Sequence, residues 1–238
     1  AETIHKQDAK IVVQLCHHGK TSSIDIAQGR PVLLPSIPPP PADPLGMLSD
    51  ITDKEMSQMA SLTAGQRPTY VAATLSQLEE IVDDFANAAQ RVQQAGIDGV
   101  EIHGAHGYLL STFLSPAWNR RTDLYGGSVE GRTRLLVEVI EAIRTRCGQS
   151  FSIIVRLDGN EYGATEGITP DDAAKHAQAA EAAGANAVHI SATSSDGTGL
   201  SFTNAPLPWS PNQYESFAQI IKASITVSYT HLRAHETD

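Results

Sequence analysis

The sequence has only two cysteines, few aromatic residues and no long apolar run. Cys16 and Cys147 are too few for a disulfide framework and lack zinc-ligand spacing, so we interpret both as reduced, buried thiols. No apolar run reaches the ~18 residues that a membrane-spanning helix needs, and residues 1–6 show no signal-peptide pattern. These absences predict a cytoplasmic protein without a membrane partner.

Basic residues are scarce as well, because 17 Lys and Arg stand against 27 Asp and Glu, for a formal net charge of −10. Nucleic acids attract local concentrations of Lys and Arg, so this excess of acids predicts no nucleic-acid partner. GxGxxG and Walker A motifs are missing, which excludes the usual nucleotide-binding fingerprints. With 238 residues, 41% of them hydrophobic, the chain can bury a sizeable core.

Short apolar runs rich in β-branched residues alternate with amphipathic helical segments. The predicted strands are residues 10–15, 99–103, 151–157 and 187–191, and a fifth begins at 225–227. The β-α-β-α order predicts a parallel sheet, which a doubly wound sheet or a (β/α)8 barrel would contain. Polar residues follow several strand ends, and this favours the barrel because a barrel carries its active site at those ends.

The helices between these strands have recognisable ends. Ser76 and Glu79 form a capping-box pair, and Pro170 suits the first turn of a later helix. Expected helix starts are Ser76, Thr169 and Ser210, and expected ends are Gly96, Gly148 and Gly184. Between residues 21 and 74, the prolines from Pro35 to Pro44 forbid a regular helix. That excursion predicts a binding loop, a lid or a solvated insertion.

Two histidines and a tyrosine cluster where the second predicted strand ends, namely His103, His106 and Tyr108. Three interpretations are open at this point. The histidines could bind a metal, although tetrahedral zinc needs at least three protein ligands. They could instead satisfy buried backbone carbonyls, or they could hold a substrate carbonyl while the tyrosine donates a proton.

Three segments resemble the old yellow enzyme family of flavin oxidoreductases. Residues 14–20, QLCHHGK, resemble its QLxHxGR strand, and residues 98–128, DGVEIHGAHGYLLSTFLSPAWNRRTDLYGGS, resemble its long signature. Val155-Arg156-Leu157 matches a third element, and the whole match runs from about residue 9 to 227. The chain looks most similar to the bacterial branch of 2,4-dienoyl-CoA reductases and NADH oxidase-like proteins.

This resemblance implies a TIM barrel that binds FMN. The implied enzyme reduces the activated C=C bond of an α,β-unsaturated carbonyl compound or a dienoyl thioester, with NADH or NADPH as electron donor. By position, Gln14 would bind the pyrimidine edge of the flavin and Arg156 would stabilise negative charge near its N1 atom. His103 and His106 would hold the substrate oxygen. Tyr108 would protonate the α-carbon.

At other positions the resemblance does not imply a single role, or the sequence departs from the family's pattern. His17 matches a family histidine and could contact the flavin or pack a loop. Lys20 stands where the family usually has Arg, and Gly131 where it usually has Asn. We interpret residues 119–128 mainly as structure, in which Asp123 and an arginine fix a loop and Ser128 caps the next helix.

The family's first two strands and its last strand have no counterpart. We therefore expect an incomplete barrel, about the third to the seventh strand, over residues 1–227, with residues 228–238 as a non-native tail. FAD and a 4Fe-4S cluster would belong only to a missing C-terminal part. Whether the chain forms a homo-oligomer is an open question at this point. The alternatives are a truncated fragment unable to hold FMN, or a flavin-free barrel that uses His103, His106 and Asp158.

Overall fold

The computed structural model describes residues 1–38, 52–164, 166–194 and 214–231. Its main sheet has five strands, all parallel, in the order of the chain. These are β1 (Val12–Leu15), β4 (Gly99–Gly104), β5 (Ser152–Tyr162), β6 (Ala187–Ser194) and β7 (Ser228–His231). Within the described residues, strands β1 and β7 each have one neighbour in this sheet, so the described sheet is open at both edges.

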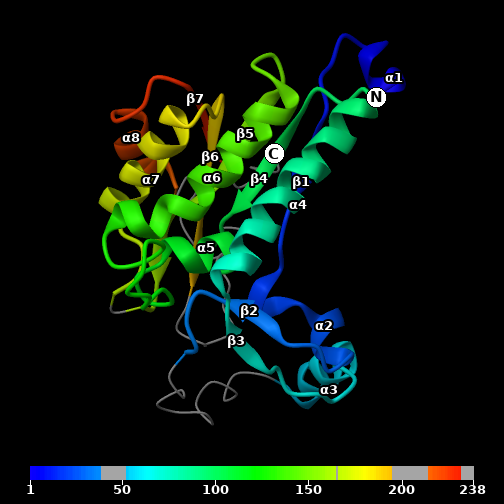
Figure 1. Ribbon diagram of the computed structural model, residues 1–238, viewed down its shortest axis with the longest axis vertical. Helices are drawn as coiled ribbons and strands as arrows, with labels where there is room; N and C mark the ends of the chain where they lie inside the picture. The colour runs from blue at the N-terminus through cyan, green and yellow to red at the C-terminus, as the bar shows by residue number, and fades with distance from the viewer. Residues whose placement is uncertain (39–51, 165, 195–213, 232–238) are drawn as a thin grey trace, which may run out of the picture.

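Four helices cover one face of this sheet, and Figure 1 shows α4, α6 and α7 side by side across it. They are α4 (Leu75–Gln94), α6 (Val129–Cys147), α7 (Pro170–Ala182) and α8 (Glu215–Lys222). Each helix packs against the next one along the chain. The strand residues beneath them are buried aliphatics, such as Ile102, Val155 and Ile190. A doubly wound sheet would carry helices on both faces, so this arrangement is part of a (β/α)8 barrel wall, as predicted.

The ends of two helices match the sequence interpretation. The Ser128 hydroxyl accepts a hydrogen bond from the Gly131 N–H at the start of α6. Thr169 and Asp172 form a capping box at the start of α7. Helix α6 ends at Gly148, as expected.

Helix α4 begins differently from the prediction. Thr74, not Ser76, is its N-cap, and the capping box pairs Thr74 with Gln77. Thr74 has the extended backbone that an N-cap requires, with φ −75° and ψ 162°, whereas Ser76 already lies in the first turn. Helix α8 starts at Glu215 with Tyr214 as its N-cap. The start expected at residues 210–213 lies outside the described residues.

The excursion between β1 and α4 contains more regular structure than the prolines suggested. Its described part has helices α2 (Ser23–Ala27) and α3 (Asp53–Leu62) and a second, two-stranded parallel sheet. The strands of that sheet are β2 (Val32–Leu34) and β3 (Tyr70–Ala72). The prediction of no regular helix is wrong for this segment, because both helices lie outside the stretch from Pro35 to Pro44.

Three short helices complete the description, namely α1 (Glu2–His5), the 3-10 turn η1 (Gly19–Thr21) and α5 (Leu109–Leu114). Strand β7 begins later than the predicted 225–227 and falls in the segment that we expected to be non-native. The origin of that segment stays a prediction. Both cysteines are free thiols, and burial raises the pKa of Cys16 to about 11. Among the helices of the described ranges, none combines the length and apolar character of a membrane span.

Candidate active site

The face of the main sheet opposite the helices is polar, and we call it the inner face. Successive side chains of a strand alternate between faces, and paired residues of neighbouring strands share one. His103 pairs with Arg156 and Arg156 with His189, so these three form a row across β4, β5 and β6. The polar residues of the inner face include Gln14, Glu101, His103, Arg156, Asp158, His189 and Ser191.

Glu101 connects two of its inner-face neighbours. Its Oε1 accepts a hydrogen bond of 2.5 Å from the Gln14 amide, and its Oε2 lies 2.9 Å from Nδ1 of His189. Burial raises the pKa of Glu101, but the bonds from His189 and Gln14 outweigh it and hold the pKa below its usual value. The carboxylate therefore stays charged and oriented. His189 has a buried Nε2 without a hydrogen-bond partner among the described residues.

Arg156 places a cation on this face. Its Nη2 donates to the Ser191 hydroxyl at 3.4 Å, while its buried Nε has no partner in the described part of the chain. Burial lowers the pKa of Arg156, opposed by the charges of Glu101 and Asp158. No ion pair of Arg156 with either acid forms among the described residues, so the guanidinium is available to a ligand.

The three predicted substrate residues come together at the carboxyl end of β4. The ring centroid of His103 lies 4.9 Å from the ring centroid of His106 and 4.7 Å from that of Tyr108. His103 Nδ1 accepts the Ala105 N–H at 3.3 Å, which places the ring proton on Nε2. Burial, followed by the positive charge of Arg156, lowers the pKa of His103 to about 4 and that of His106 to about 3. Both rings are therefore neutral hydrogen-bond donors near pH 7.

His106 has a left-handed backbone, with φ +63°, which is uncommon for a residue other than glycine. Its N–H donates to Asp158 Oδ2 at 2.9 Å, and its Nε2 lies 2.6 Å from the Ser191 hydroxyl. Ser111 also donates to Asp158, at 2.8 Å. Burial raises the pKa of Asp158 to about 8 in spite of these bonds.

Sequence reasoning missed three polar members of this site as functional candidates, namely Glu101, His189 and Ser191. The available signal was strand alternation, which places Glu101 on the face of His103 and Ser191 on the face of His189. The sequence pointed to Asp158 only through the alternative of a flavin-free barrel.

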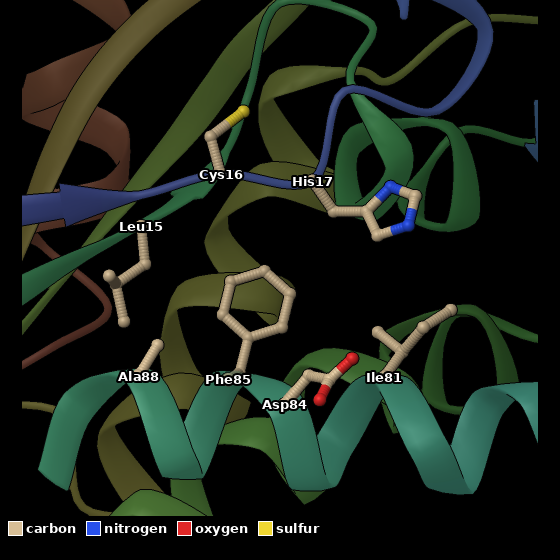
Figure 2. A pocket seen from close by; sticks show the side chains of 7 residues that line it. All are labelled: Leu15, Cys16, His17, Ile81, Asp84, Phe85 and Ala88. Carbon is tan, nitrogen blue, oxygen red and sulfur yellow. The ribbon is translucent and has the colours of Figure 1, made fainter. Parts of the chain in front are cut away.

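His17 lies on the helix side of the sheet, away from the inner face. Figure 2 shows its ring over Ile81 and Asp84 of α4, with the Cys16 thiol turned away from that helix. The pocket between β1 and α4 has a volume of about 150 Å³ and a largely apolar lining that includes Leu15 and Phe85. His17 Nδ1 accepts the Gly19 N–H at 3.1 Å. This geometry supports loop packing rather than a flavin contact.

Lys20 supports the loop that carries the histidines. Its Nζ lies 3.5 Å from the ring centroid of Trp118, and its Cε would be 3.3 Å from a Cβ at Gly107. Burial lowers the pKa of Lys20 to about 8. A lysine in place of the family's arginine therefore keeps a cation against an aromatic face.

The signature loop at residues 119–128 is structural, as interpreted. The Arg121 guanidinium pairs with Asp123 at 2.5 Å and donates to the carbonyls of Pro35 and Ala73 at 3.1 and 2.7 Å. Gly131, where the family usually has Asn, approaches this loop closely, since a Cβ there would lie 2.1 Å from the Gly126 carbonyl oxygen. A larger residue would require a different loop backbone.

Within the described ranges, no group of three or more His, Cys, Asp or Glu side chains is arranged to hold a metal ion. The sequence model of the NADH:flavin oxidoreductase / NADH oxidase family matches residues 1–223. The chain is 35% identical over 192 residues to an NADH oxidase of Thermoanaerobacter brockii, which covers 81% of this chain and 26% of that protein. It spans less than half the length of this and other curated relatives.

Solved structures show the same fold. A 2-naphthoyl-CoA reductase in complex with 2-naphthoyl-CoA superposes with a TM-score of 0.61 and 28% identity, over 71% of this chain and 24% of that one. An old yellow enzyme homologue from Zymomonas mobilis superposes with a TM-score of 0.69 and 24% identity, over 98% of this chain and 59% of that one. The predicted incomplete (β/α)8 barrel is confirmed.

Proposed function

Because the chain belongs to the NADH:flavin oxidoreductase / NADH oxidase family, we propose that it is part of an FMN-dependent ene-reductase. FMN, when bound, would relay a hydride from NADH or NADPH to the activated C=C bond of an unsaturated carbonyl compound or a dienoyl thioester. One observation carries this proposal. Two neutral imidazoles and a phenol converge at the end of β4, beside an inner face that offers an amide and a guanidinium.

The inner-face residues fit a flavin. Arg156 Nε and His189 Nε2 are buried polar atoms without partners in the described residues, and such atoms are costly unless a ligand or water satisfies them. The Gln14 amide nitrogen donates to Glu101, and the Gln14 amide oxygen is therefore left to accept an N–H of a ligand. We therefore propose that Gln14 and Arg156 hold the cofactor, Gln14 at its polar ring edge and Arg156 where negative charge develops on reduction.

The histidines and the tyrosine have different tasks in this proposal. His103 and His106 donate hydrogen bonds to the substrate carbonyl, whose oxygen gains negative charge in the transition state. Neutral donors suit this task because they polarise the oxygen without first losing a proton. Tyr108 lies at the N-cap of α5 against the His103 ring, and its phenol gives the α-carbon its proton. The substrate is a small molecule.

The second candidate is a truncated fragment that cannot hold FMN. The specific observation behind it is the open sheet: in the part of the chain that the structure describes, β1 and β7 each lack a second neighbour, and Gln14 of β1 is exposed. An exposed edge strand is also a site of unintended pairing.

A flavin titration of the 238-residue chain separates the two candidates. FMN fluorescence is followed while protein is added, and the bound chain is then mixed anaerobically with NADH or NADPH and with an enone. The ene-reductase proposal expects saturable quenching, bleaching of the flavin by the nucleotide and reoxidation by the enone. Absence of saturable binding supports the truncated fragment. Bound FMN that the enone cannot reoxidise contradicts the ene-reductase.

A further inference from the structure

Helix α5, which carries Tyr108 at its start, is joined to β5 by two hydroxyl–carboxylate hydrogen bonds. Ser111 donates to Asp158 at 2.8 Å, and Ser115, one helical turn later, donates to Glu161 at 2.5 Å. Both carboxylates are buried, with 1% and 5% of their surfaces exposed. The two pairs are chemically alike, which makes each a control for the other.

A β-bulge makes this double connection geometrically feasible. Residues three apart on a regular strand point to opposite faces. Here Asp158 pairs with Ser191 and Glu161 with Thr193, so three steps on β5 correspond to two on β6. The extra residue changes the alternation of β5 and lets both carboxylates reach the serines of α5.

The two carboxylates differ in their second partner. Glu161 Oε2 accepts the N–H of Ile168, at 3.0 Å, in the segment that follows β5. Asp158 instead accepts the N–H of His106, at 2.9 Å to Oδ2 and 3.2 Å to Oδ1. This bond holds His106 at its left-handed φ of +63°, a conformation that persists only where its surroundings impose it.

The imidazole of His106 is held from the neighbouring strand. Its Nε2 lies 2.6 Å from the hydroxyl of Ser191, the residue on β6 that pairs with Asp158. Arg156 donates to the same hydroxyl and cannot accept a hydrogen bond from it. Of these two partners, only His106 Nε2 can therefore accept the Ser191 O–H. The backbone and the ring of His106 are thus fixed by two residues that face each other across β5 and β6.

We propose that Asp158 is a positioning residue that fixes the backbone of His106 and thereby aims its imidazole at the substrate oxygen. The placement of His106 stands on contacts within the chain, whereas the substrate oxygen rests on the proposed function. Asp158 suits the task because its carboxyl oxygens can accept both the His106 N–H and the Ser111 hydroxyl.

The test compares Asp158→Ala, Asp158→Asn and Glu161→Ala by NMR of the flavin-free chain with ¹⁵N-labelled histidine. Asp158→Ala is expected to move the His106 amide signal and to convert its ring from one tautomer into a mixture. Asp158→Asn keeps an acceptor oxygen and is expected to preserve one tautomer. Glu161→Ala loses a matching serine bond and is expected to leave His106 unchanged. Equal effects of the two alanine variants, or none for Asp158→Ala, would overturn the proposal.

A second measurement needs no variant. The His106 amide lies in a loop, yet its bond to a buried carboxylate is expected to slow its hydrogen exchange at least about 100-fold relative to an unstructured peptide. Exchange at the unstructured rate would also overturn the proposal.

In the FMN-loaded chain, Asp158→Ala is expected to raise KM for an enone about 10–100-fold, while flavin reduction by NAD(P)H changes less than about twofold. An unchanged KM would overturn the substrate-aiming part of the proposal. If the wild type reduces no enone, the proposed function fails, and the NMR comparison alone decides the placement of His106.

Discussion

The Nδ1 atom of His189 lies 2.9 Å from Oε2 of Glu101, although the strands of these two residues are separated by β5. Neighbouring strands are about 4.8 Å apart, so side chains two strands away meet only where the sheet is concave. This contact therefore records the curvature of the barrel wall. It also connects the cofactor candidate Gln14, the other partner of Glu101, to the opposite side of the inner face.

Replacing Glu101 by Gln is expected to weaken FMN binding. Gln14 and His189 both donate to Glu101, and a glutamine offers one acceptor oxygen in place of two. Loss of one such bond is expected to cost about 1–2 kcal/mol, or roughly 5–30-fold in Kd, measured by quenching of FMN fluorescence. Glu138→Gln, whose carboxylate bonds the Tyr125 hydroxyl, is the matched control. Equal Kd values for Glu101→Gln and wild type would contradict the role of Glu101.

Replacing Tyr108 by Phe is expected to slow enone reduction about 10²–10⁴-fold, because the phenol proton is removed while the ring contacts with His103 and His18 remain. Flavin reduction by NAD(P)H should stay nearly intact. Anaerobic stopped-flow absorbance measures the two half-reactions separately, with Tyr125→Phe as a tyrosine control outside the site. If both half-reactions fall equally, Tyr108 is not the proton donor.

The pH dependence of stability is expected to change when Asp158 becomes Asn. The pKa of Asp158 rises from 3.8 to about 8 on folding, so the folded chain binds more protons than the unfolded chain between these values. The free energy of unfolding contributed by this group therefore falls as pH rises from about 4 to about 8. Urea unfolding of wild type against Asp158→Asn from pH 5 to 9 should show this decline only in wild type. Parallel curves would rule it out.

His103 and His106 act with the opposite sign. Their pKa values fall on folding from 6.5 to about 4 and about 3, so the unfolded chain binds more protons in this range. Their contribution to stability is thus complete above pH 6.5 and is lost as the solution becomes more acidic. The same urea series, extended to pH 4 with His103→Gln, should show a weaker acid dependence in the variant.

Arg144 is expected to contribute strongly to the free energy of unfolding, although it lies outside the candidate active site. Its guanidinium donates to the carbonyls of Phe151, Gly148 and Gly184, at 2.5, 2.9 and 2.7 Å. Arg144→Met leaves these acceptors unpaired and is expected to lower the free energy of unfolding by about 3 kcal/mol or more. Arg146→Met is the matched control, because Arg146 forms a partly exposed ion pair with Asp83, and should cost below about 1 kcal/mol. Urea denaturation measures both, and equal losses would contradict this account.

Local patterns in the sequence were sufficient for several elements. The caps of α6 and α7 depend on residues three positions apart, which any reader of the sequence can see. The start of α4 could not be fixed in this way, since Thr74 with Gln77 and Ser76 with Glu79 both satisfy the same spacing. Strands β2 and β3 span three residues each, too few for an alternation to be recognised.

The candidate site likewise contains residues that local sequence patterns reveal and residues that they do not. His103, His106 and Tyr108 are close in sequence, so their cluster was predictable, whereas Glu101 meets His189 only through sheet curvature. Asp158 reaches Ser111 and His106 beside a bulge, and a bulge leaves no mark in the hydrophobic pattern. Contacts over long sequence distances depend on packing that the local pattern does not encode.

The bulge of β5 also sets rules for building chimeras of this barrel. Up to Asp158 the even-numbered residues of β5 lie on the inner face. From Glu161 onward the odd-numbered residues do, because of the extra residue in the bulge. A recombination junction placed before residue 158 or after 161 preserves this phase. A junction between them, or a one-residue deletion there, would rotate Glu161 away from Ser115 and break the buried hydrogen bond between them. Segments exchanged with other barrels at this strand must therefore bring their own extra residue.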